Sequence, residues 1–158
     1  MFNPRYRRRE PIDPDLAVPA RRREAERPHL AVLAAVALGG GIGATARYGA
    51  SVAWPTAPDG FPFTTLLVNV LGCALIGVLM AVLAEARSAH RLARPFLGTG
   101  VLGGFTTFST WALELQTLVE HGQARAALVY LLVTLAAALA AVWAAAGATR
   151  RLIAWRRR

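Results

Sequence analysis

The polar side chains that could bind a ligand or take part in a reaction lie mostly inside apolar segments of this sequence, where a polar group needs a specific reason to be present. The densest group is VLGGFTTFSTWALE, residues 101–114, in which two adjacent glycines precede four hydroxyl residues. Glycine and threonine are weak helix formers, so the segment predicts a break in a membrane-spanning helix. Freed backbone is tolerated at membrane depth only where it is buried in protein or lines a water-filled cavity. Carbonyls at such a break bind cations and donors bind anions, so we expect an ion site here, with a packing kink as the alternative.

Other polar residues inside the apolar segments are few. A single threonine usually bonds back to carbonyls of its own helix, which is the simpler interpretation of Thr45 and Thr134. Asn69 differs, because its amide has two donor hydrogens that a helix cannot satisfy. Its side chain therefore faces a neighbouring helix or a pore, and the sequence leaves both open. Glu114 is the only acid deep in an apolar segment.

Phe108 and Trp111 are aromatic residues of the same segment, three positions apart. This spacing places both rings on one helical face, where they can present ring edges that carry positive partial charge. Such edges suit an anion. Two core aromatics beside a packing kink are the alternative.

Enzyme chemistry is not predicted from these residues. The three histidines, at positions 29, 90 and 121, fall at helix ends or in loops, and Cys73 has apolar neighbours. These residues form neither a metal-ligand spacing nor a pair of nucleophile and base.

Four apolar stretches must position the polar residues. The chain has 158 residues, of which 55% are hydrophobic and only 17% charged. The stretches 30–53, 63–85, 96–119 and 124–149 each exceed the roughly 20 residues that a helix needs to cross the hydrocarbon layer. All nine prolines lie outside them, where they remove no interior helical hydrogen bond. The sequence therefore predicts an all-α membrane protein with a four-helix channel domain over residues 30–149, the third helix being broken at mid-membrane.

The arginines are concentrated in three segments. Residues 1–29, the loop 86–95 and residues 150–158 together hold sixteen of the 18 basic residues, and none is lysine. In a four-helix chain these segments share one side, so the positive-inside rule predicts a bacterial plasma-membrane protein with both termini in the cytoplasm. Residues 1–29 are predicted to be a disordered Arg- and Pro-rich tail and residues 150–158 a basic tail, both contacting anionic lipid headgroups. The membrane accounts for the net charge of +9, so no nucleic-acid partner is predicted.

Three sequence blocks carry a family resemblance. GGGIGATARY (39–48), TLLVNVLGCALIG (65–77) and GVLGGFTTFSTWALE (100–114) occur in order and resemble the signature blocks of the CrcB/Fluc fluoride channels. The resemblance covers roughly residues 30–149 and leaves out both basic tails. It implies a fluoride-selective channel that exports cytoplasmic fluoride passively down its gradient and protects the cell from fluoride toxicity. It also implies an antiparallel, dual-topology dimer with two fluoride pores and a structural sodium ion at the dimer interface.

The same resemblance implies roles for individual residues. Asn69 would be a pore-lining donor, and the backbone carbonyls of Gly104 and Thr107 would bind the sodium. Arg47 would attract anions at the vestibule, the alternative being that it snorkels to the interface. The other pore residues would be Phe108, Ser109, Thr110, Trp111, Tyr130 and Thr134. Neutral donors of this kind replace the water around fluoride without a full positive charge that would trap the ion.

Two features depart from the family pattern. Trp111 stands where the pattern usually has its second pore phenylalanine, and its larger ring adds an indole donor. The arginine bias is the second departure, because a homodimer of antiparallel subunits requires each chain to insert both ways. We therefore expect this chain to insert one way and to form a heterodimer with an oppositely oriented paralogue.

Two functions from other classes remain open on the sequence. A small four-helix multidrug-type exporter coupled to protons needs a carboxylate in its first helix, and residues 30–53 have none. A non-transporting membrane assembly subunit would use the Gly39 to Gly43 spacing only for close helix packing.

Overall fold

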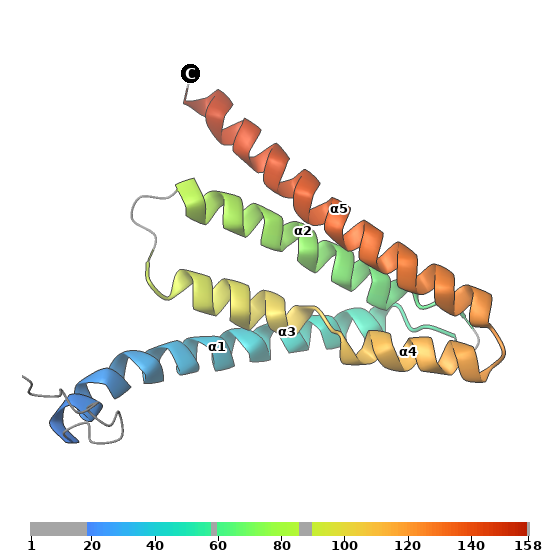
Figure 1. Cartoon of the computed structure of the whole chain (residues 1–158), viewed down its shortest axis with the longest axis horizontal. Helices are drawn as coiled ribbons and strands as arrows, with labels where there is room; N and C mark the ends of the chain where they lie inside the picture. Colours follow the sequence, from blue (N-terminus) through green and yellow to red (C-terminus); the bar gives the residue numbers. More distant parts are fainter. Residues whose placement is uncertain (1–18, 58–59, 86–89, 158) are drawn as a thin grey trace, which may run out of the picture.

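The computed structural model describes residues 19–57, 60–85 and 90–157, with side chains from residue 30 onward. Its helices are α1 (Pro19–Ala53), α2 (Phe63–Glu85), the π-helix η2 (Arg94–Leu102), α3 (Gly103–Phe105), α4 (Ser109–Glu120) and α5 (Ala124–Arg156) (Figure 1). The described residues contain no strand, which confirms the all-helical prediction.

Three helices are long and apolar enough to cross a membrane. They are Leu30–Ala53 within α1, the whole of α2, and α5. The predicted third stretch, 96–119, is divided among η2, α3 and α4, and none of these pieces reaches the roughly 20 residues of a spanning helix. The lengths and composition of the three long helices are those of a multi-pass membrane protein.

The outer helices extend further than the sequence predicted. Residues 19–29, predicted to be part of a disordered tail, are the first turns of α1. Alanine, arginine and glutamate are good helix formers, and Pro19 suits the first helical position. α5 continues to Arg156, so most of the predicted C-terminal tail is helical as well. Residues 1–18 of the predicted N-terminal tail, and residue 158, lie outside the described residues.

The helices pack as two groups, which Figure 1 shows side by side. α2 lies along α5, whereas α1 lies along η2 and α3, and α4 packs on α5. The buried core cluster lies between α4 and α5 and consists of Trp111, Leu118, Ala127 and Tyr130. Many large apolar side chains outside this cluster are exposed, as expected for helices whose surroundings are lipid or another subunit.

Glycines permit the closest approach between α1 and η2. A Cβ atom added to Gly39 or Gly43 would overlap the backbone carbonyl oxygen of Phe96 or Val101, respectively. A Cβ on Gly104 would in turn overlap the carbonyl oxygen of Gly40. The GGGIG block therefore packs α1 directly against the segment that leads into the predicted break.

Candidate functional site

The helical path is interrupted between α3 and α4. α3 ends at Phe105, Thr106 is extended with φ −76° and ψ 160°, and α4 begins at Ser109. The backbone amides that follow the interruption lose their helical carbonyl partners and require other acceptors.

Asn69 on α2 supplies one such acceptor. Its Oδ1 accepts a hydrogen bond from the backbone N–H of Thr107 at 2.8 Å, and its Nδ2 donates to the carbonyl oxygen of the same residue at 2.9 Å. The side-chain amide thus pairs with Thr107 as a second backbone would. The amide therefore faces the non-helical residues between α3 and α4 and holds the interruption in place, while one Nδ2 hydrogen is left over.

The hydroxyl of Thr107 supplies a second acceptor. It accepts the backbone N–H of Thr110 at 3.2 Å, lies 3.0 Å from that residue's Oγ1, and is 3.5 Å from Oγ of Ser109. Thr107 therefore caps the first turn of α4. In a continuous helix the amides of Thr107 and Thr110 would bond the carbonyls of Gly103 and Thr106. The interruption frees these two carbonyls.

Arg47 on α1 reaches the interruption from the other side. Its Nε donates to the carbonyl oxygen of Gly104 at 3.2 Å. The carbonyls of Gly104 and Thr107, which were predicted to bind sodium, therefore each accept one hydrogen bond from a side chain. A small cavity of about 150 Å³ opens here, lined mainly by polar residues: Arg47, Tyr48, Ser51, Thr64, Thr65, Val68, Thr107 and Thr110.

Glu114 on α4 joins three helices. Its Oε1 accepts the hydroxyl hydrogen of Thr65 on α2, and its Oε2 accepts that of Tyr130 on α5, both at 2.7 Å. Tyr130 has no exposed surface, so its hydroxyl hydrogen is fully committed to the carboxyl group. The sequence placed Tyr130 among the pore donors, and the structure gives it this internal partner.

Two buried donors beside Tyr130 have no partner. Trp111 is 8% exposed and Thr134 is 5% exposed. Neither the indole Nε1 nor the threonine Oγ1 has a hydrogen-bond partner within the described chain. Buried polar groups are nearly always bonded, so these two donors have spare capacity for a ligand or for water.

The two aromatic residues of the interruption have different surroundings. Phe108 is 76% exposed, whereas Trp111 belongs to the buried core cluster. Their ring centroids are 5.4 Å apart with the planes tilted by 46°. Phe108 precedes the first residue of α4 but already has helical backbone angles, φ −94° and ψ −40°, so the two rings lie on the same side although only Trp111 is buried.

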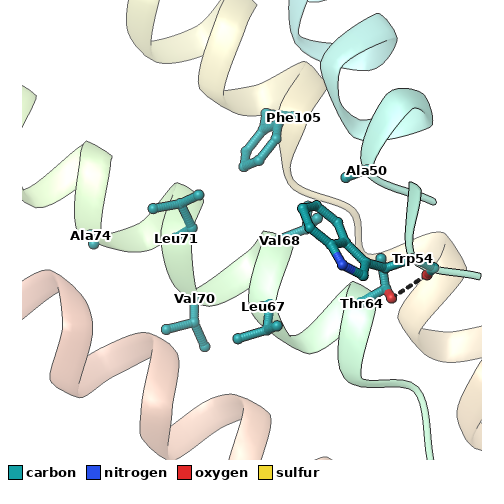
Figure 2. Close-up of a pocket in the computed structure, with 9 residues that line it drawn as sticks. All are labelled: Ala50, Trp54, Thr64, Leu67, Val68, Val70, Leu71, Ala74 and Phe105. Atoms are coloured by element: carbon teal, nitrogen blue, oxygen red, sulfur yellow. Dashed lines mark hydrogen bonds between the residues drawn. The ribbon is translucent and has the colours of Figure 1, made fainter. Parts of the chain in front are cut away.

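A larger pocket lies between the C-terminal part of α1 and α2, but it has little polar chemistry. Figure 2 shows its lining, which is almost entirely apolar: Ala50, Trp54, Thr64, Leu67, Val68, Val70, Leu71, Ala74 and Phe105. The Thr64 hydroxyl is bonded to the carbonyl oxygen of Trp54. An apolar surface of this kind cannot replace the water around an ion, so the polar residues at the interruption remain the candidate site.

The predicted site residues therefore fall into two groups and one separate residue. The interruption group contains Arg47, Asn69, Gly104, Thr107, Ser109 and Thr110. The second group, which we call the Glu114 cluster, contains Glu114 and its two partners Tyr130 and Thr65, with Trp111 and Thr134 as buried neighbours. Phe108 makes no hydrogen bond to either group of described residues and is exposed, with its ring beside that of Trp111. Sequence reasoning missed Thr65 and gave Glu114 no role, although an acid deep in a spanning segment is itself a signal of function.

Comparison with known proteins gives a consistent set of relatives. The family model described as "CrcB-like protein, Camphor Resistance (CrcB)" matches residues 34–146. The Fluoride-specific ion channel FluC 1 of Streptomyces coelicolor is 58% identical over 134 residues, which cover 85% of this chain and 87% of the relative. The Fluoride-specific ion channel FluC 2 of Streptomyces avermitilis is 60% identical over 78% of this chain and 79% of its own. The protein of the same name from Nocardia farcinica is 55% identical, over 76% of this chain and 86% of its own.

Proposed function

This chain belongs to the CrcB family, and we propose that it is a fluoride-specific ion channel that exports cytoplasmic fluoride passively down its gradient. This activity protects the cell from fluoride toxicity and is not enzymatic. The observation that carries the proposal is the naming of relatives at 55–60% identity as fluoride-specific ion channels. The chemistry of the site agrees, because neutral amide, hydroxyl and indole donors can replace the water around a small anion.

The proposed pathway uses donors that the protein leaves free. One Nδ2 hydrogen of Asn69 remains after its bond to Thr107, and the donors of Trp111 and Thr134 are buried without partners. Tyr130 can donate to fluoride only by releasing Glu114. The other proposed contributors are the hydroxyls of Ser109 and Thr110, the ring edges of Phe108 and Trp111, and the guanidinium of Arg47 at the vestibule.

Assembly completes the proposed channel. We place η2, α3 and α4 together as a third transmembrane segment broken at mid-membrane, and two subunits pair antiparallel with their breaks in contact. A structural sodium ion at that contact would balance the freed carbonyls. Gly104 and Thr107 are the predicted ligands, and the carbonyls of Gly103 and Thr106, which lose their helical donors, are the nearest competitors.

The orientation of the subunit follows from its charges. The ends of α2 and α5 and the start of η2 lie at one end of the molecule (Figure 1), and exposed arginines cluster there, at positions 91, 94, 150, 151, 156 and 157. We propose that this end faces the cytoplasm of a bacterial cell, across the plasma membrane. The bias favours one direction of insertion and therefore an oppositely oriented paralogue as partner. The numbered names of the relatives indicate organisms with more than one such protein.

Fluoride efflux from liposomes that contain this chain alone tests the proposal, with chloride as the control ion and a fluoride electrode as the detector. Fast efflux of fluoride but not chloride is expected of a homodimeric channel. Efflux only after coexpression with a paralogue of opposite arginine bias identifies a heterodimer. Proton-coupled export of organic cations without fluoride efflux would overturn the proposal in favour of a multidrug-type exporter. The absence of any flux in both preparations would favour an assembly subunit.

A further inference from the structure

The C-terminal end of α5 extends beyond the length that a bilayer requires. α5 runs from Ala124 to Arg156 over 33 residues, which at 1.5 Å per residue is about 50 Å. The hydrocarbon core is about 30 Å thick. A helix that enters this core near Ala124 leaves it well before its last turns, which begin at Arg150. Figure 1 shows this end of α5 at the edge of the molecule.

The last turns of α5 have two unlike sides. One side faces the bundle, where Ile153 is half-buried and the guanidinium of Arg157 pairs with the carboxylate of Glu85 on α2 at 2.8 Å. The other side holds Arg151, Leu152, Trp155 and Arg156, which at 100° per residue lie within an arc of about 140°. We call these four residues the α5 end face.

The α5 end face is uncovered by the rest of the described chain. Leu152 is 51% exposed and Trp155 is 72% exposed. Arg151 and Arg156 are also exposed, and neither has an acidic partner among the residues that the structure describes. The end face therefore combines two unpaired guanidinium groups with two open apolar side chains.

This combination matches one kind of ligand. Guanidinium groups bind phosphate with two parallel hydrogen bonds, and tryptophan prefers the headgroup level of a bilayer, where its ring is half apolar and half wet. Leu152 adds a second apolar side chain to the same face. An acidic soluble protein would match the arginines alone.

We propose that the α5 end face is a binding surface for anionic phospholipid headgroups, which hold the cytoplasmic end of α5 at the membrane surface. The surface lies far from the ion site and does not depend on fluoride conduction. Each arginine near an anionic surface contributes about 1 kcal/mol, so removal of two charges should lower the preference for anionic lipid by about thirtyfold.

Native mass spectrometry of the full chain tests this proposal, with equal amounts of phosphatidylglycerol and phosphatidylcholine offered in a neutral detergent. The unaltered chain should retain phosphatidylglycerol preferentially. In the double variant Arg151→Gln, Arg156→Gln, that preference should fall by about thirtyfold. The matched control is Arg125→Gln at the opposite end of the same helix, which should keep it. An unchanged preference in the double variant, or an equal loss in the control, would overturn the proposal.

Two further measurements protect the test from misfolding of the variant. In the unaltered chain, the preference should weaken as sodium chloride rises, because exposed charges are screened within about 10 Å at 0.1 M salt. The variant Trp155→Leu keeps every charge and should reduce retention of both lipids together, not the preference between them. A preference that salt does not change would contradict the electrostatic role of the arginines.

Discussion

The interruption group and the Glu114 cluster satisfy their polar atoms in opposite ways. At the interruption, broken backbone is repaired by side chains of other helices, namely Asn69 and Arg47, and by the hydroxyl of Thr107. In the Glu114 cluster the backbone is helical and both carboxylate oxygens of Glu114 are bonded, while the neighbouring donors of Trp111 and Thr134 have no partner in the described chain. The first group uses its hydrogen bonds to hold a shape, and the second retains two buried donors without a partner in the described chain.

The largest effect is expected from closing the space that the interruption needs. Gly43→Ala adds a Cβ that overlaps the carbonyl oxygen of Val101, so α1 must move away from η2 and Arg47 from Gly104. We expect loss of the native helix packing and of fluoride efflux, as an overpacked helix contact loses about 1–3 kcal/mol or more. Gly41→Ala is the matched control, because no atom lies within 4 Å of its added Cβ. Size-exclusion profiles and efflux rates that do not differ between the two variants would contradict the packing role.

The next effect tests whether Asn69 only holds the interruption. Asn69→Leu removes both bonds to Thr107 and leaves a buried amide and carbonyl without partners, which should lower stability by about 2–4 kcal/mol. Asn69→Asp keeps the acceptor for the Thr107 amide but places a carboxylate in the proposed anion path, so it should abolish efflux with less loss of stability. Thermal unfolding in detergent and liposome efflux measure the two quantities. Normal efflux through Asn69→Asp would exclude this side chain from the pore.

Substitution of Glu114 provides the corresponding test of the Glu114 cluster. Glu114→Ala leaves the hydroxyls of Thr65 and Tyr130 buried without their acceptor, so we expect about 1–3 kcal/mol lower stability. Tyr130→Phe removes one of the two bonds and no more, and should cost about half as much. A double-mutant cycle of Glu114→Ala with Tyr130→Phe, followed by thermal unfolding, should show coupling between the two residues. Strict additivity would mean that the hydrogen bond contributes nothing to stability.

The smallest change in stability is expected at the unpartnered donors. Thr134→Val and Trp111→Phe each remove a buried donor that has no protein partner. Thr134→Val keeps the size of the side chain, so stability should stay within about 1 kcal/mol, whereas Trp111→Phe also removes ring volume from the core cluster and should cost about 1–2 kcal/mol. If fluoride uses these donors, efflux falls while stability is kept, which is the reverse of what a packing residue would show. Measuring the efflux rate and the unfolding temperature of each variant separates the two roles. Unchanged efflux in both would assign the spare donors to water.

The sequence predicted individual features better than their partners. The segment of two glycines before hydroxyl residues predicted a break, and the helical path is interrupted after the glycines, which are themselves in α3. The amide chemistry of Asn69 predicted that it must face another segment. It did not identify Thr107 as the partner, because the two residues are 38 positions apart. Glu114, Thr65 and Tyr130 come from three helices, and no local spacing predicts their meeting. Helical spacing predicted one face for Phe108 and Trp111, and their rings lie side by side, but it did not predict that one ring would be exposed and the other buried.

The order of residues around the interruption has a consequence for how the chain is made. Arg47 and Asn69, the side chains that bond the interruption from other helices, both precede it in the sequence. During synthesis α1 and α2 are therefore complete before the segment that contains the interruption is made. The side chains that bond its backbone are thus already present when the segment is made, which shortens the time in which these groups would face lipid without a partner. Tyr130 is synthesised later than the interruption, so the hydrogen bonds of the Glu114 cluster are completed after those of the interruption group.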